Sequence, residues 1–186
     1  MIDNGGDVDT QNIIIRVVDP LGLNVSTRVG EVGRPFSSTL QGTGGTGKFT
    51  YSLSGLPAGL RFDNTQTISG TPAARGTATV AVTVKDSDGN TQVVNVPVVI
   101  YAKLKVASSV LRAATKGQTY AARLRVTGGA RPFRWTAQGL PRGLRLNAST
   151  GQLSGHAAAA GTFRVRITVR DALGASATRA LALSVH

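Results

Sequence analysis

The sequence predicts an all-β chain made of two tandem β-sandwich domains, and three observations carry this prediction. One stretch occurs twice: Leu56–Gly70 reads LPAGLRFDNTQTISG, and Leu140–Gly155 reads LPRGLRLNASTGQLSG. Apolar and polar residues alternate along several short runs, which is the period of half-buried strands. Helical periodicity is absent, and clusters of Gly, Pro, Asn and Asp separate the runs.

The duplicated stretch sets the domain organisation. Leu56 and Leu140 lie 84 positions apart, and the flanking sequences match at nearly the same offset. Phe49-Thr50-Tyr51 aligns with Phe133-Arg134-Trp135, and Val80–Asp86 aligns with Val165–Asp171. Matches spaced in this way mark a duplicated folding unit. We therefore place repeat 1 at residues 20–101 and repeat 2 at residues 102–186.

Residues 1–19 are predicted to be the last strand of a truncated preceding repeat. Ile13, Ile15 and Val17 fall on the positions of Val96, Val98 and Ile100 in repeat 1. An apolar strand without its own domain tends to pair with an exposed sheet edge. We therefore expect residues 13–18 to pair with an edge of the first domain or of a neighbouring molecule.

Within repeat 1, the alternation assigns side chains to the core. The inward set is Phe36, Ser38, Leu40, Phe49, Tyr51, Leu53, Ala78, Val80, Val82 and Val84. The Gly42–Gly47 segment spells GxGxxG, but a strand pattern follows it instead of the helix that a dinucleotide site requires. We interpret this segment as a hairpin turn. Pro97 cannot donate to a ladder, so its strand should be an edge there or carry a bulge.

Repeat 2 has an equivalent core and basic outer faces. Trp135 and Leu144 should be buried close together, with Tyr51 and Leu60 as their counterparts; the alternative for Trp135 is an exposed ring that stacks on sugars. The predicted outward arginines of one sheet are Arg134, Arg164, Arg166 and Arg170, and those of the other are Arg123, Arg125 and Arg145.

These motifs resemble an immunoglobulin-like repeat domain of large bacterial surface and secreted proteins, which belongs with the dystroglycan-type, cadherin-like modules. The motifs are LPxGLxF/L, then TxxISG or TGQLSG, then Gly-Thr, then a period-two apolar strand that ends in Asp. The resemblance covers nearly the whole chain. It implies two tandem immunoglobulin-like or cadherin-like sandwiches, an extracellular or cell-surface location in bacteria, and adjacent repeats of the same chain as partners.

The resemblance also raises a calcium site, because cadherin-like modules stiffen their junctions with this ion. Asp86, Asp88 and Asn90 supply oxygens in one turn, and an immunoglobulin topology brings that turn near Asp19. Calcium takes about six to eight oxygen ligands. In the alternative, Asp86 and its counterpart Asp171 only hydrogen-bond the turn backbone.

The positive charge is concentrated in repeat 2. The whole chain has a formal net charge of +12, but residues 102–186 contain fourteen Lys and Arg against one acid, Asp171. Such asymmetry suggests a polyanionic partner. Arg134, Arg164, Arg166 and Arg170 are therefore a candidate polyanion-binding face, for an anionic glycan or lipopolysaccharide. The alternative is a set of solvated arginines. A flat face without an aromatic platform argues against nucleic acid.

Composition argues against catalysis. There is no cysteine, and the two histidines, His156 and His186, have no matched carboxylate or nucleophile. No apolar run approaches the roughly 20 residues of a membrane-spanning helix. We expect no cofactor and a non-enzymatic stalk, spacer or adhesion module. Two alternatives stay open: a glycan-binding module, and an accessory domain of a secreted carbohydrate-active enzyme.

Overall fold

The structure is a computed structural model, and it describes residues 17–186 as two β-sandwiches without a helix. The first sandwich contains β1 (Gly22–Val25), β2 (Val29–Glu31), β3 (Phe36–Thr43), β4 (Thr50–Ser54), β5 (Leu60–Phe62), β6 (Thr67–Gly70), β7 (Gly76–Lys85) and β8 (Thr91–Tyr101). Its sheets have the strand orders β1-β3-β6-β5 and β2-β8-β7-β4. The predicted all-β fold is confirmed. The predicted pairing of Ile13–Val18 falls mostly outside the described residues.

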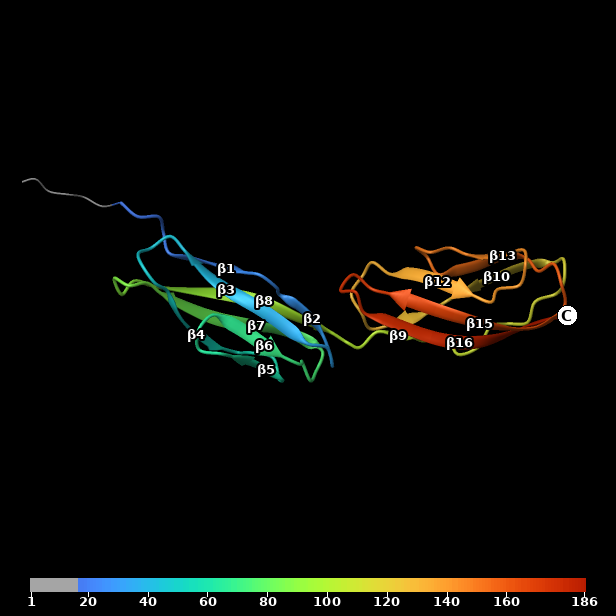
Figure 1. The fold of residues 1–186 in the computed structure, drawn as a ribbon, viewed down its shortest axis with the longest axis horizontal. Helices are drawn as coiled ribbons and strands as arrows, with labels where there is room; N and C mark the ends of the chain where they lie inside the picture. Colours follow the sequence, from blue (N-terminus) through green and yellow to red (C-terminus); the bar gives the residue numbers. More distant parts are fainter. Residues whose placement is uncertain (1–16) are drawn as a thin grey trace, which may run out of the picture.

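The second sandwich repeats this plan. It contains β9 (Lys105–Val106), β10 (Thr119–Arg123), β11 (Val126–Thr127), β12 (Arg134–Gln138), β13 (Leu144–Leu146), β14 (Gln152–His156), β15 (Gly161–Arg170) and β16 (Ser176–Val185). Its sheets are β10-β14-β13 and β12-β15-β16, and β9 pairs with β11. The two sandwiches lie end to end, joined by a short linker after β8 (Figure 1).

Each sandwich has a separate core between its two sheets. In the first, Leu40, Val80 and Val82 are completely buried, and in the second, Leu153, Val165 and Ile167 are. Trp135 and Leu144 are 4% and 6% exposed and belong to the same cluster, which confirms that Trp135 fills the core. Its counterpart Tyr51 is only half-buried, and its hydroxyl accepts a hydrogen bond from the backbone N–H of Gly42 at 2.7 Å.

The repeated LPxGL motif forms a tight turn that leads into β5 in the first sandwich and into β13 in the second. The N–H groups of Leu60 and Leu144 donate to the carbonyls of Pro57 and Pro141. Gly59 and Gly143 have φ angles of +88° and +89°, which L-residues with a side chain rarely adopt. A Cβ at Gly59 would collide with the Thr71 carbonyl. The motif therefore serves the fold.

Two local predictions have different outcomes. Pro97 faces Thr79 of β7, while the parallel pairing of β8 with β2 begins only at Val99, so β8 is an edge at Pro97 as predicted. The interpretation of Gly42–Gly47 as a hairpin turn is wrong. This segment joins β3 to β4, and those strands belong to different sheets. The alternation of single strands does not reveal which sheet each one joins.

Candidate functional site

The predicted calcium ligand Asp86 is buried, and its carboxylate is surrounded by N–H donors. Oδ1 accepts hydrogen bonds from the backbone N–H groups of Asp88 and Asn90, at 3.1 and 2.9 Å. Oδ2 accepts from the Asn90 amide at 3.0 Å and from the Thr46 N–H at 3.1 Å. These bonds, that of the Asn90 side chain first, lower the pKa of Asp86 below its usual range. Both oxygens therefore already have partners within the protein.

Asp19 lies at the same end of the first sandwich, as predicted. Its carbonyl accepts the Gly45 N–H at 2.9 Å, and a Cβ on Gly45 would lie 2.8 Å from Asp86 Oδ2. In the second sandwich, Asp171 similarly accepts the N–H groups of Ala130, Leu173 and Ala175. The shared aspartates thus tie the end turn of each sandwich to a neighbouring loop.

Calcium binding by Asp19, Asp86, Asp88 and Asn90 stays a prediction. Among residues 17–186, no three His, Asp or Glu side chains gather as a metal group. An ion at this turn would have to displace N–H donors from Asp86. That requirement favours the turn-bonding interpretation of Asp86 and Asp171.

The arginine-bearing face lies on the β12-β15-β16 sheet, where the alternation predicted it. Arg134 of β12 is directly opposite Arg170 of β15, and Gln138 is opposite Arg166. All four predicted arginines, Arg134, Arg164, Arg166 and Arg170, are exposed. A depression of about 620 Å³ beside Arg164 and Arg166 also includes Arg179. Arg123 and Arg145 lie on strands of the other sheet, as predicted, whereas Arg125 lies between β10 and β11 and belongs to neither strand.

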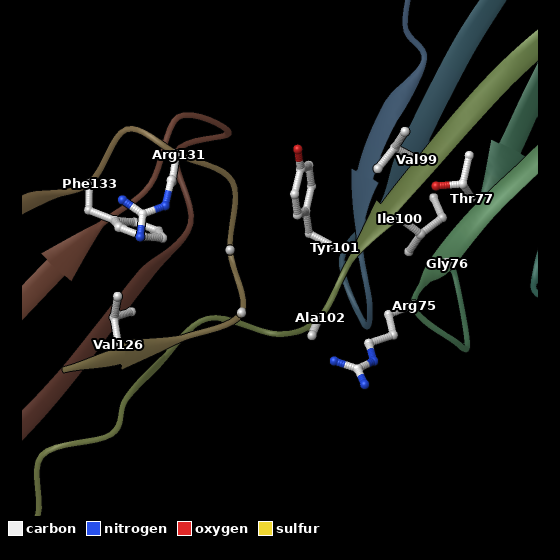
Figure 2. Close-up of a pocket in the computed structure, with 12 residues that line it drawn as sticks. Arg75, Gly76, Thr77, Val99, Ile100, Tyr101, Ala102, Val126, Arg131 and Phe133 are labelled. Atoms are coloured by element: carbon white, nitrogen blue, oxygen red, sulfur yellow. The ribbon is translucent and has the colours of Figure 1, made fainter.

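A second basic feature lies at the domain junction, and the sequence analysis did not find it. An open cleft of about 620 Å³ is lined by residues of both sandwiches: Arg75, Gly76, Thr77, Val99, Ile100, Tyr101, Ala102, Val126, Gly128, Gly129, Arg131 and Phe133. Figure 2 shows the Tyr101 ring standing between the two sandwiches and Arg75 extending toward the linker. The Arg131 guanidinium lies over the Phe133 ring, 5.4 Å from its centroid.

Glu31 connects the two sandwiches beside this linker. It is 3% exposed, and Oε1 accepts the backbone N–H of Leu104, which is a core residue of the second sandwich. Oε2 has no hydrogen-bond partner and lies 3.9 Å from Arg34 Nε. The corresponding position of the second sandwich is Thr115. This difference between copies is the only sequence signal that points to Glu31.

His156 and Trp135, two further side chains singled out in the sequence, have neighbours within the protein. His156 is exposed, and its Nε2 lies 3.1 Å from the Thr119 hydroxyl. Trp135 covers Gly151, where a Cβ would lie 2.8 Å from the indole ring, so its face is not free for a sugar. None of the residues from 17 to 186 belongs to a helix suited to crossing a membrane.

Comparisons with known proteins agree with this architecture. The family model described as "Putative Ig domain" matches residues 19–101 and again residues 97–186. The serine-rich adhesin for platelets of Staphylococcus aureus (strain USA300) is 35% identical over 96 residues, which are 47% of this chain and 4% of the adhesin. This chain therefore spans only a small part of that relative.

Solved structures show the same tandem fold. The I-band fragment I67–I69 of titin has a TM-score of 0.55 at 11% identity and covers 90% of this chain and 66% of its own. The C-terminal 282-residue fragment of intimin, solved with the intimin-binding domain of its translocated receptor, has a TM-score of 0.51 at 15% identity. It covers 86% of this chain and 62% of its own. With two matches of the family model that together span residues 19–186, the chain belongs to the family described as "Putative Ig domain".

Proposed function

We propose that this chain is a non-enzymatic segment of a bacterial cell-surface or secreted protein, where it acts as a stalk, spacer or adhesion module. The double match to the family model carries the proposal. The adhesin relative supports the surface location, since the aligned stretch belongs to a protein named as an adhesin for platelets. Tandem repeats that contact only their neighbours can hold a binding region at a distance.

The arrangement of the two sandwiches supports the spacer role. The described chain enters at the far end of the first sandwich, and the C-terminus lies at the far end of the second (Figure 1). The linker is short, and the Glu31–Leu104 hydrogen bond crosses it. A further sandwich joined in the same way would therefore increase the length of the molecule and not its width.

Two measurements test this proposal. Small-angle X-ray scattering of the full chain should give the distance distribution of two sandwiches in line. The second measurement is the retention of beads coated with the chain on platelets and on a surface that bears an anionic glycan. Retention indicates an adhesin, and its absence indicates a spacer. Retention no greater than that of bare beads means that the segment is only a spacer. A compact, folded-back scattering profile would contradict both roles.

The second candidate function is weak binding of a polyanion by the exposed face that carries Arg134, Arg164, Arg166 and Arg170. The cross-strand pairing of Arg134 with Arg170 favours it, because like charges directly opposite are unfavourable for the fold itself. The planar guanidinium matches phosphate, sulfate and carboxylate groups. An anionic glycan or lipopolysaccharide fits an exposed, positively charged surface of this kind, and its binding should weaken with salt.

A heparin column tests the polyanion candidate with the full chain. We expect the wild type to be retained at low salt and released at moderate salt. Arg164→Glu with Arg166→Glu should abolish most of the retention. The matched control is Arg28→Glu with Arg61→Glu, which makes the same change of charge at exposed positions of the first sandwich. Equal losses in both double variants would show an effect of net charge without a defined face.

A further inference from the structure

We propose that the interdomain cleft is a binding site for a short carboxylated oligosaccharide, separate from the arginine-bearing sheet face. Its arginines come from both sandwiches: Arg75 from the first and Arg131 from the second. No Asp or Glu is among the residues that line it, so the cleft is positively charged. Its volume of about 620 Å³ is in the range of small-molecule sites, about 300–1,000 Å³.

The two arginines of the cleft are available to a ligand. Both are exposed, and the one ion pair among the described residues joins Glu31 to Arg34 instead. Arg131 is held in place by its position over the Phe133 ring. A guanidinium binds a carboxylate through two parallel N–H···O bonds, which fix its orientation as well as its position. Because the arginines belong to different domains, a ligand that reaches both contacts the two sandwiches at once.

Tyr101 supplies a surface for the sugar ring. It is 37% exposed although it ends β8, and Figure 2 shows its ring projecting between the sandwiches with the hydroxyl outward. Its backbone is fixed, because its carbonyl accepts the Val32 N–H at 2.9 Å. An aromatic ring with an apolar face and a polar tip suits a saccharide, which presents C–H groups on its faces and hydroxyls at its rim.

The same strands argue against a peptide as the ligand. Peptides often bind by adding a strand to an exposed sheet edge. At Val99–Tyr101, β8 is paired with β2 on one side, and Val99 and Ile100 are paired with β7 on the other. At Val99 and Ile100, β8 therefore has no free edge. An oligosaccharide needs only side chains and is compatible with this geometry.

The internal duplication supplies a control that separates ligand binding from folding. Residues required by the sandwich occur in both copies, as Gly59 and Gly143 do. The cleft residues do not: Arg75 corresponds to Ala160, Arg131 to Gly47, and Tyr101 to His186. The fold accommodates those other residues, so it does not itself require the two arginines and the tyrosine.

Titration with a hyaluronan hexasaccharide, followed by NMR on the full chain, tests the site. This probe carries carboxylates without sulfates, and chitohexaose is the neutral control. We expect the carboxylated sugar to shift resonances of Tyr101 and Arg131, and the neutral sugar to bind at least tenfold more weakly. Arg75→Ala with Arg131→Gln should weaken binding by about tenfold or more, as loss of charge-assisted hydrogen bonds does. Tyr101→Leu should also weaken it.

The other arginine sites give matched controls. Arg164→Gln with Arg166→Gln, and Arg61→Gln, should leave the hexasaccharide affinity unchanged. Three results would overturn the proposal: no binding at millimolar sugar, loss of binding only in the Arg164/Arg166 variant, or tighter binding of an oligoglutamate peptide than of the sugar. The unfolding temperature of each variant identifies losses that come from misfolding. Failure here leaves the spacer role and the sheet face untouched, because neither depends on Arg75 or Tyr101.

Discussion

Asp86 of the first sandwich and Asp171 of the second anchor corresponding end turns, whereas Glu31 of the first corresponds to Thr115 of the second. The two aspartates act within their own sandwich, whereas Glu31 acts at the junction between the sandwiches. The aspartates satisfy N–H groups of their own sandwich. Glu31 instead satisfies an N–H group of the next domain. The comparison separates residues that make the sandwich from residues that join or decorate it.

The surfaces follow the same division. The core strands β7 and β15 alternate identically, with valines and an isoleucine inside. Their outward positions are Thr79, Ala81 and Thr83 in the first copy, and Arg164, Arg166 and Thr168 in the second. The core fixes the inward positions, and the outward ones are free to acquire charge. Four substitutions distinguish the residues of the shared fold from those that differ between the copies.

The largest expected effect is in the core. Leu144→Ala should destabilise the second sandwich by about 2–5 kcal/mol, the range for large-to-small core substitutions. Trp135 is the only tryptophan, so its fluorescence reports unfolding of the second sandwich alone. The matched Leu60→Ala should leave the fluorescence transition in place and lower the stability of the first. If Leu60→Ala moves that transition equally, the two cores do not act separately.

The next effect is at the junction. Glu31→Ala removes the acceptor for the Leu104 N–H and should weaken the junction by about 1–3 kcal/mol, the cost of a buried donor without a partner. Residual dipolar couplings should show a broader distribution of domain orientations, while each sandwich keeps its own structure. Thr115→Ala is the control at the corresponding position. An unchanged orientation in the Glu31 variant would remove its role as an interdomain contact.

The charge on the sheet face should have a smaller effect of opposite sign. Arg170→Glu places an acid opposite Arg134 and should stabilise the second sandwich by about 0.2–1 kcal/mol. Salt should screen this gain. Lys85→Glu, opposite Thr50 in the first sandwich, is the control and should be nearly neutral. Destabilisation by Arg170→Glu would mean that the arginines support the fold.

The smallest expected effect concerns the exposed carboxylate of Asp63 and depends on pH. Three backbone N–H groups, those of Thr65, Gln66 and Thr67, bond Asp63 Oδ1. These bonds, with that from Thr67 contributing most, hold the pKa of Asp63 well below its usual value. A carboxyl with a depressed folded-state pKa stabilises fully above its unfolded pKa, near 3.9, and loses that contribution as the pH falls further.

Asp63→Asn should therefore lower the number of protons that the first sandwich takes up on unfolding below about pH 4, by at most one. Its stability should then fall less steeply as the pH is lowered. The variant should be slightly less stable than the wild type near pH 7 and should approach it in acid, where the wild type also loses the charge of Asp63. The counterpart Asn147 accepts two such N–H bonds in the second sandwich, so a neutral side chain fits this turn. Urea unfolding at several pH values measures the difference. An unchanged pH profile would show that Asp63 titrates alike in the folded and unfolded chains.

Much of the fold was predictable from the sequence. The alternation assigned Val80, Val165 and Trp135 to the core and Arg164 and Arg166 to the surface, because successive strand residues face opposite sides of a sheet. The duplication gave the number of units. The relation of Gly42–Gly47 to the sheets could not be read in this way. A glycine-rich turn between two strands looks the same whether the strands pair or lie in different sheets.

The sequence alone determined the two sandwiches, their inward residues and the concentration of charge in the second, because each depends on local periodicity or on direct repetition. Only the tertiary structure showed that Glu31 contacts Leu104 and that Arg75 and Arg131 line one cleft. These residues are far apart in the chain, and no period relates them. Their proximity follows from the end-to-end arrangement of two folded domains, which brings the end of one sandwich near the linker and loops of the next.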